Sequence, residues 1–96
     1  MRMKASSLLQ IQQIMIENGK AGKFSMWTIY DHPLDYPDSY VARLFEITGN
    51  GETQITENII ITPDLDLLRH IMIDDLHLTV MDRFPTDDLK IIEVWL

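Results

Sequence analysis

The chain has 96 residues, of which 46% are hydrophobic and 24% are charged, and its formal net charge is -7. This length and balance predict one globular domain with a single core and exclude a disordered chain. Because the sequence contains no cysteine, it excludes a disulfide framework, a thiolate nucleophile and cysteine-bound zinc.

The charge is divided unevenly along the chain. Residues 1–25 carry a net charge of +3, whereas residues 26–96 carry -10. An acidic surface repels nucleic-acid backbones and accelerates the encounter with a basic partner. The sequence therefore predicts no direct nucleic-acid binding. Excess acid can also serve only to keep a small protein soluble.

Residues 7–19 predict a short amphipathic helix. Ser7 and Gln10 can form a capping box, apolar residues then recur at helical spacing, and Gly19 is suited to end the helix. Residues 19–25 are expected to be a linker. Glutamines interrupt the apolar run, and no stretch approaches the roughly 18 apolar residues of a membrane span. We therefore expect a cytoplasmic protein without a signal peptide or a membrane segment.

Two strands joined by a stiff loop follow the linker. Residues 26–30 are β-branched or aromatic, and this run stops at the loop 33–39, which contains two prolines. Strand character resumes over residues 40–48. The pair Asn50 and Gly51 then favours the positive φ angles of a tight hairpin turn.

The turn leads into a third strand over residues 52–56, which is followed by a second helix. Thr62 can cap this helix, with Pro63 in its first position and aspartates in its first turn, where the helix dipole favours carboxylates. Leucine, isoleucine and methionine residues then line one face of the helix. We expect it to end near residues 74–75.

Two further strands complete the pattern. Apolar and polar residues alternate over residues 76–80, and a turn-rich stretch at 85–88 leads to a last strand over 90–96. The order helix, three strands, helix, two strands predicts an α+β fold, in which a small antiparallel β-sheet of four to five strands packs against one or two helices. Because the last strand could pair across a two-fold axis, a monomer and a homodimer both stay open.

The loop between the first two strands holds the residues that come nearest to a metal or catalytic site. Asp31, His32, Asp35 and Asp38 could ligate a divalent ion, but their spacing matches no known calcium or zinc loop, and aspartate beside proline or serine commonly bonds to backbone amides. Asp31 and His32 should point to opposite faces of a strand end, which is a poor arrangement for acid–base catalysis. We therefore expect no metal, no cofactor and no catalytic residue.

Arg43 is unusual because it lies in the middle of an otherwise apolar strand. Such an arginine must reach the sheet edge or pair with an acid, and Glu93 in the last strand is the candidate partner. The pair could fix strand register, or the arginine could be offered to an anionic ligand. Tyr36 and Arg43 form the best candidate cleft. On the second helix, His70 is expected to pair with Asp66.

The strings WTIYDHP, DYPDSYVARLFEI, LDLLR and DRFPTDDLKIIEVWL extend over nearly all of residues 26–96. In this pattern the chain resembles a family of small bacterial proteins without an assigned activity, whose members begin at the position of Met26. The resemblance implies a bacterial setting and no mechanism. We hypothesise that residues 1–25 are an N-terminal helix and linker added to a single α+β domain over residues 26–96. The family-pattern residues are Trp27, Tyr30, Asp31, His32, Pro33, Arg43, Arg69, Arg83 and Trp95.

The sequence favours a small acidic interaction module without catalytic activity, because a stiff loop held on a rigid sheet commonly carries binding. Its partner is expected to be a protein, and the charge would attract a basic one. Two alternatives stay open. One is a small protein or enzyme in which Arg43 and Arg83 bind an anionic ligand and His32 transfers a proton, and the other is an acidic mimic of nucleic acid. The candidate binding residues are Tyr30, Asp31, His32, Tyr36, Arg43 and Arg83.

Overall fold

The computed structural model describes residues 4–5, 7–82 and 89–96. The strands are Lys4–Ala5 (β1), Phe24–Asp31 (β2), Tyr40–Ile47 (β3), Thr53–Thr62 (β4), Val80–Met81 (β5) and Ile91–Trp95 (β6), and the helices are Leu8–Lys20 (α1) and Leu65–His70 (α2), the latter continued by a π-helical turn over Ile71–Asp75.

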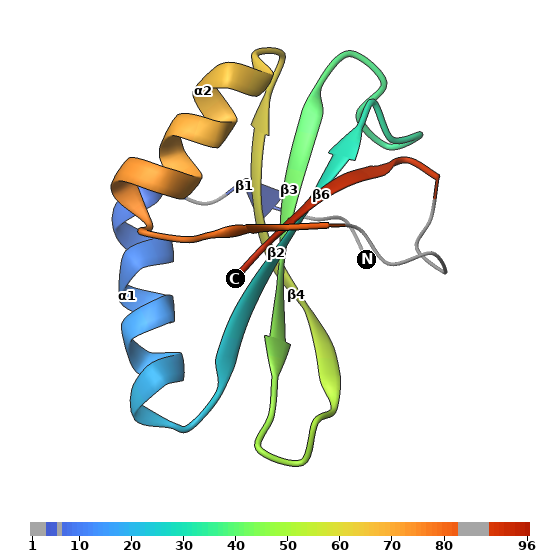
Figure 1. Cartoon of the computed structure of the whole chain (residues 1–96). Helices are drawn as coiled ribbons and strands as arrows, with labels where there is room; N and C mark the ends of the chain where they lie inside the picture. The colour runs from blue at the N-terminus through green and yellow to red at the C-terminus, as the bar shows by residue number, and fades with distance from the viewer. Residues whose placement is uncertain (1–3, 6, 83–88) are drawn as a thin grey trace.

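The described strands form one sheet in the order β1-β4-β3-β2-β6-β5 (Figure 1). The strands β2 to β6 pair antiparallel with their neighbours, whereas the two-residue β1 pairs in parallel with β4 at one edge. Two helices pack against the sheet, and the predicted α+β fold is therefore confirmed. Neither described helix is long and apolar enough to cross a membrane.

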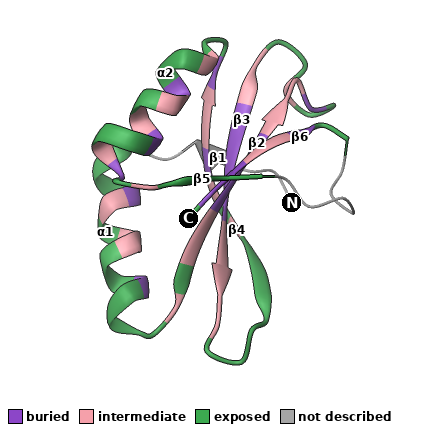
Figure 2. Cartoon of the chain, in the orientation of Figure 1, coloured by how far each residue is buried: buried purple, intermediate pink, exposed green. Residues whose placement is uncertain are grey.

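Both helices lie on the same side of the sheet (Figure 1). Side chains alternate between the two faces of a strand, so every second residue of β2 and β3 points toward the helices. Figure 2 shows that the buried residues lie along the middle of the sheet and on the inner side of the helices. The core between them consists of Ile11, Trp27, Ile29, Ala42, Leu44, Leu68, Met72, Leu76 and Trp95.

The first helix begins as predicted and ends slightly later. Ser7 accepts a hydrogen bond from the backbone of Gln10 at 3.2 Å, and its own amide donates to the Gln10 side chain at 3.1 Å, which confirms the capping box. Gly19 was expected to end the helix, but α1 continues to Lys20, and Gly22 adopts the left-handed conformation with φ of 74°. Because β2 already begins at Phe24, the predicted linker shrinks to residues 21–23.

The turn after β3 differs from the expected hairpin. Gly51 has a positive φ of 81°, whereas Asn50 does not. The amide of Thr48 donates to the carbonyl of Glu52 at 2.9 Å and closes a longer turn that needs a single left-handed residue. The strand that follows, β4, extends to Thr62 and is therefore much longer than predicted.

The start of α2 was predicted two residues too early. Thr62 is the last residue of β4, where it pairs with Tyr40 in β3, and its hydroxyl accepts from the amide of Asp64 at 3.1 Å rather than from an amide of the helix. Asp64 is the cap instead, and its carboxylate accepts from the amides of Asp66 at 3.0 Å and Leu67 at 3.3 Å. The buried face of the helix is as expected, since Leu68 and Met72 belong to the core.

The predicted strand over residues 76–80 is wrong. After the π-helical turn, Leu76 points into the core and His77 adopts a left-handed conformation with φ of 55°, which interrupts an extended strand. The chain becomes extended only near β5, where Thr79 exchanges two backbone hydrogen bonds with Leu96, at 2.9 and 3.0 Å. The turn expected at 85–88 lies outside the described residues.

That residues 1–25 are an addition to the fold stays a prediction. The burial of Ile11 nevertheless leads to a testable expectation about this segment. Ile11 is 0% exposed, whereas Leu9 on the same helix is 78% exposed. We expect Ile11→Ala to lower the free energy of unfolding by about 2–4 kcal/mol, because it leaves a cavity in the core, and Leu9→Ala to change it by less than about 0.5 kcal/mol. Urea unfolding of both variants measures this, and equal effects would mean that α1 does not contribute to the core.

Candidate functional site

Arg43 lies on the face of the sheet that the helices do not cover, because its neighbours Ala42 and Leu44 point into the helix-side core. The residue is only 8% exposed. Its Nη2 atom donates to both carboxylate oxygens of Asp35, at 2.8 and 2.6 Å. The guanidinium carbon also lies 5.0 Å from the centre of the Tyr30 ring. Arg43 therefore ties the loop 32–39 to this face of the sheet.

Glu93, the predicted partner of Arg43, pairs with another arginine. Its carboxylate accepts from Arg69 of α2, at 2.9 Å from Nε and 2.6 Å from Nη2, and this hydrogen bond raises the pKa of Arg69. The strand register explains the difference. Glu93 lies opposite Ile29 on the helix side of the sheet, whereas Arg43 lies opposite Thr28 and points to the other side.

Asp31 and His32 are in contact, contrary to the expectation that they point to opposite faces. The strand ends at Asp31, and His32 adopts a left-handed conformation with φ of 49°, which brings its Nδ1 atom to the carboxylate of Asp31. The imidazole also packs edge-on against Tyr40, with ring centres 4.8 Å apart. The His32 amide donates to the carbonyl of Ser39 at 3.0 Å and closes the base of the loop.

A pocket of about 400 Å³ opens beside Arg43. Leu34, at its rim, is 95% exposed, whereas Pro33 is buried and anchors the loop. Lys90 comes to the site because its carbonyl accepts a hydrogen bond from the Asp31 amide at 2.7 Å, which joins the residue before β6 to the end of β2. The described residues that line the pocket are Tyr30, Pro33, Leu34, Arg43 and Lys90.

The structure brings two of the six predicted binding residues to this pocket, Tyr30 and Arg43. Tyr36 was expected to form a cleft with Arg43, but it is not among the described lining residues, and its amide donates to Pro33 at 3.0 Å within the loop. Asp31 and His32 form their own half-exposed pair. Arg83 lies outside the described residues.

Sequence reasoning missed Leu34, Asp35 and Lys90 as members of the site. Asp35 carried a usable signal, because it lies midway in a short loop between two strands, eight residues before the arginine that needs an acid. Leu34 and Lys90 carried none, since an isolated leucine or lysine is common on any protein surface.

The histidines and aspartates make pairs rather than a larger cluster. In the parts of the chain that the structure describes, no group of three or more of these residues could hold a metal ion. The expectation that His70 pairs with Asp66 is wrong, because His70 lies 2.6 Å from Asp74 one turn later, and Asp66 lies 3.8 Å from Arg69. Each of these pairs is accounted for by the geometry of one helix.

No protein-family model, no curated protein and no solved structure matches the chain. The resemblance to small bacterial proteins therefore stays a prediction.

Because Arg43 and Asp35 form an ion pair, we expect that substituting one or the other changes the free energy of unfolding by different amounts. Asp35→Ala should lower the free energy of unfolding by about 1–2 kcal/mol, because it leaves the buried Arg43 cation without its carboxylate, while the half-exposed position of Asp35 keeps the effect below that of a fully buried pair. Arg43→Met should cost less, since methionine retains apolar contact and water can solvate Asp35. Urea unfolding of both variants and the double variant tests this. Strictly additive effects would show that the two side chains do not interact.

Proposed function

We propose that the protein is a non-catalytic interaction module that binds a protein partner through the surface around its pocket. We call the lining residues Tyr30, Pro33, Leu34, Arg43 and Lys90 the Arg43 surface. The observation that carries the proposal is the position of Leu34, which is 95% exposed at the rim of the pocket. A single exposed leucine is ordinary, but this one sits on a loop that a buried charge holds in place.

The loop that presents Leu34 is fixed by several independent contacts. Pro33 is buried, Asp35 is bonded to Arg43, and the Tyr36 and Ser39 amides close two turns at 3.0 and 3.3 Å. A surface that is already ordered loses little conformational entropy when a partner binds. The arrangement therefore supports recognition by a preformed loop.

The composition of the Arg43 surface fits a protein interface. Tyrosine and arginine are enriched among the residues that contribute most to binding energy, and an exposed leucine adds apolar area that a partner can bury. A second leucine, Leu89, is 90% exposed directly beside Lys90. Because residues 26–96 carry a net charge of -10, the chain as a whole would attract a basic partner.

The proposal predicts that Leu34→Ser abolishes partner binding without affecting the fold. The matched control is Leu9→Ser, which removes a similarly exposed leucine from α1. The tagged full chain and both variants are used to capture proteins from a lysate of the source organism, and the captured proteins are identified by mass spectrometry. We expect one stoichiometric partner with the wild type and with Leu9→Ser and none with Leu34→Ser. Equal capture by Leu34→Ser, or no partner with any of the three, would contradict the proposal.

A second candidate function is the binding of a small anionic ligand at the same pocket. The observation that favours it is that two of the lining residues, Arg43 and Lys90, are cationic in a chain that is otherwise acidic. The Asp35 carboxylate already pairs with the guanidinium of Arg43, so an external anion would have to displace Asp35. His32, the expected proton donor, does not line this pocket among the described residues.

If an anion must displace Asp35 from Arg43, removing the Asp35 carboxylate should strengthen the binding of that anion. Asp35→Asn should bind inorganic phosphate more tightly than the wild type, because it removes the competing carboxylate from Arg43. Thermal unfolding with and without phosphate, at matched ionic strength, should show a larger rise in Tm for Asp35→Asn than for the wild type and no rise for Arg43→Met. If all three proteins respond equally, phosphate acts as a general stabilising salt and this candidate is excluded.

A further inference from the structure

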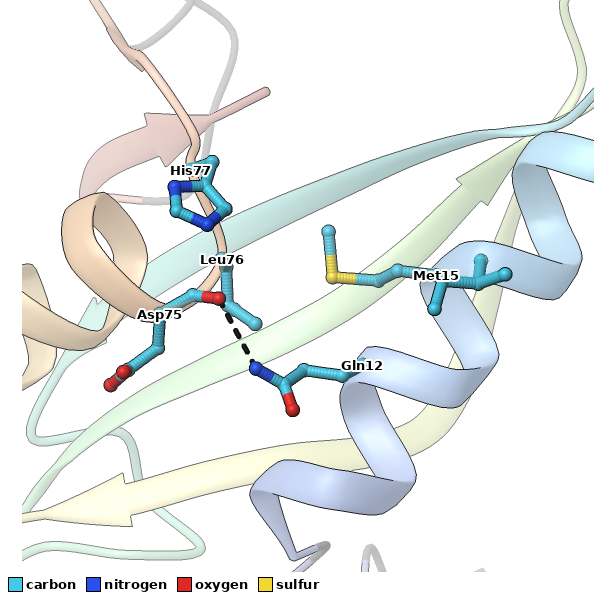
Figure 3. A pocket seen from close by; sticks show the side chains of 6 residues that line it. Gln12, Met15, Asp75, Leu76 and His77 are labelled. Carbon is cyan, nitrogen blue, oxygen red and sulfur yellow. Dashed lines mark hydrogen bonds between the residues drawn. The ribbon is translucent and has the colours of Figure 1, made fainter.

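A second pocket, of about 310 Å³, lies between α1 and the segment that follows α2 (Figure 3). It is on the helix side of the sheet and shares none of its described lining residues with the Arg43 surface. The Gln12 side chain donates to the carbonyl of Asp75 at 3.3 Å and bridges the two walls. The described lining residues are Gln12, Met15, Ile16, Asp75, Leu76 and His77.

Two uncommon backbone conformations meet at this pocket. Residues Ile71–Asp75 form a π-helical turn, and His77 has a positive φ of 55°. Turns of the π type are frequent at functional sites, and a left-handed residue other than glycine is a strained conformation that the surrounding structure must maintain. Between them, Leu76 points into the core while the imidazole of His77 lies at the edge of the pocket (Figure 3).

The lining chemistry selects against anionic ligands. The apolar walls are Met15, Ile16 and Leu76, and no lysine or arginine is among the described lining residues. In Figure 3 the carboxylate of Asp75 points away from Met15. An anion that entered the pocket would lose water without meeting a lysine or arginine, which is unfavourable.

The same lining favours an aromatic ligand with one polar group. The thioether of Met15 makes favourable contacts with aromatic rings, and the imidazole of His77 adds a flat surface. The side-chain oxygen of Gln12, whose nitrogen donates to the Asp75 carbonyl, and the ring nitrogens of His77 supply hydrogen-bonding atoms in the lining. The volume is at the small end of the range for ligand pockets, about 300–1,000 Å³.

We infer that this pocket is a binding site for a small uncharged aromatic molecule that carries one hydrogen-bonding group. The inference is independent of the proposed function, because it concerns another face of the protein and other residues.

Phenol is the probe, and its binding is followed by NMR of the methyl groups of Met15 and Leu76 in the full chain. We expect saturable shifts of these methyl groups with a dissociation constant in the millimolar range, as is usual for so small a ligand. Benzoate, which has a similar ring and a negative charge, should bind at least about tenfold more weakly. Shifts that do not saturate, or benzoate binding as tight as that of phenol, would overturn the inference.

A pair of tryptophan substitutions tests whether the probe occupies this pocket. Ile16 is 54% exposed at the pocket and Leu9 is 78% exposed two turns earlier on α1. Ile16→Trp should fill the pocket and abolish the phenol shifts, whereas Leu9→Trp adds the same indole elsewhere and should leave them unchanged. Equal phenol affinity in the two variants would contradict the assignment.

His77→Gly separates a binding role from a structural one. Glycine tolerates the positive φ at this position, so the variant should have a higher Tm than the wild type. It should also bind phenol at least about threefold more weakly, because the imidazole is lost. An unchanged phenol affinity would overturn the role of His77, whatever happens to the stability.

Discussion

The ion pair between Arg43 and Asp35 fixes the loop between β2 and β3, and the surface that this loop presents depends on it. Alternation along β3 places Arg43 on the face without helices, where a buried cation requires an acid nearby. The loop supplies that acid, and Tyr30 covers the guanidinium. The requirement to neutralise one buried charge therefore adds a side-chain tie to the sheet to the backbone hydrogen bonds that shape this loop.

The two faces of the sheet have different roles in this account. On the helix side, Arg69 and Glu93 make a second ion pair that connects α2 to β6, and a continuous apolar core holds the layers together. On the other side, polar and aromatic residues of β2 and β3 meet a loop. Arg43 thus connects the loop 32–39 to the sheet, and Arg69 connects α2 to it. The register of the strands decides which acid each arginine meets.

Much of the fold was predictable because the signals are local. The capping box of α1, the β-branched and aromatic strands β2 and β3 and the proline-containing loop depend on residues close together in the sequence. The left-handed His32 and His77 and the π-helical turn were not predictable, since they result from packing of the whole chain. The partner of Arg43 was missed for the same reason, because the face on which Glu93 lies depends on the pairing of β2 with β6.

The most direct test of a loop fixed by Arg43 is backbone amide hydrogen exchange of His32, Tyr36 and Ser39, measured by NMR in the wild type and in Asp35→Ala. These amides donate within the loop, at 3.0, 3.0 and 3.3 Å. We predict that they are protected in the wild type and exchange about tenfold faster in Asp35→Ala, as loss of about 1.4 kcal/mol of local stability would produce. Equal exchange in the wild type and in Asp35→Ala would contradict a loop fixed by Arg43, and unprotected exchange in the wild type would contradict the preformed recognition surface built on it.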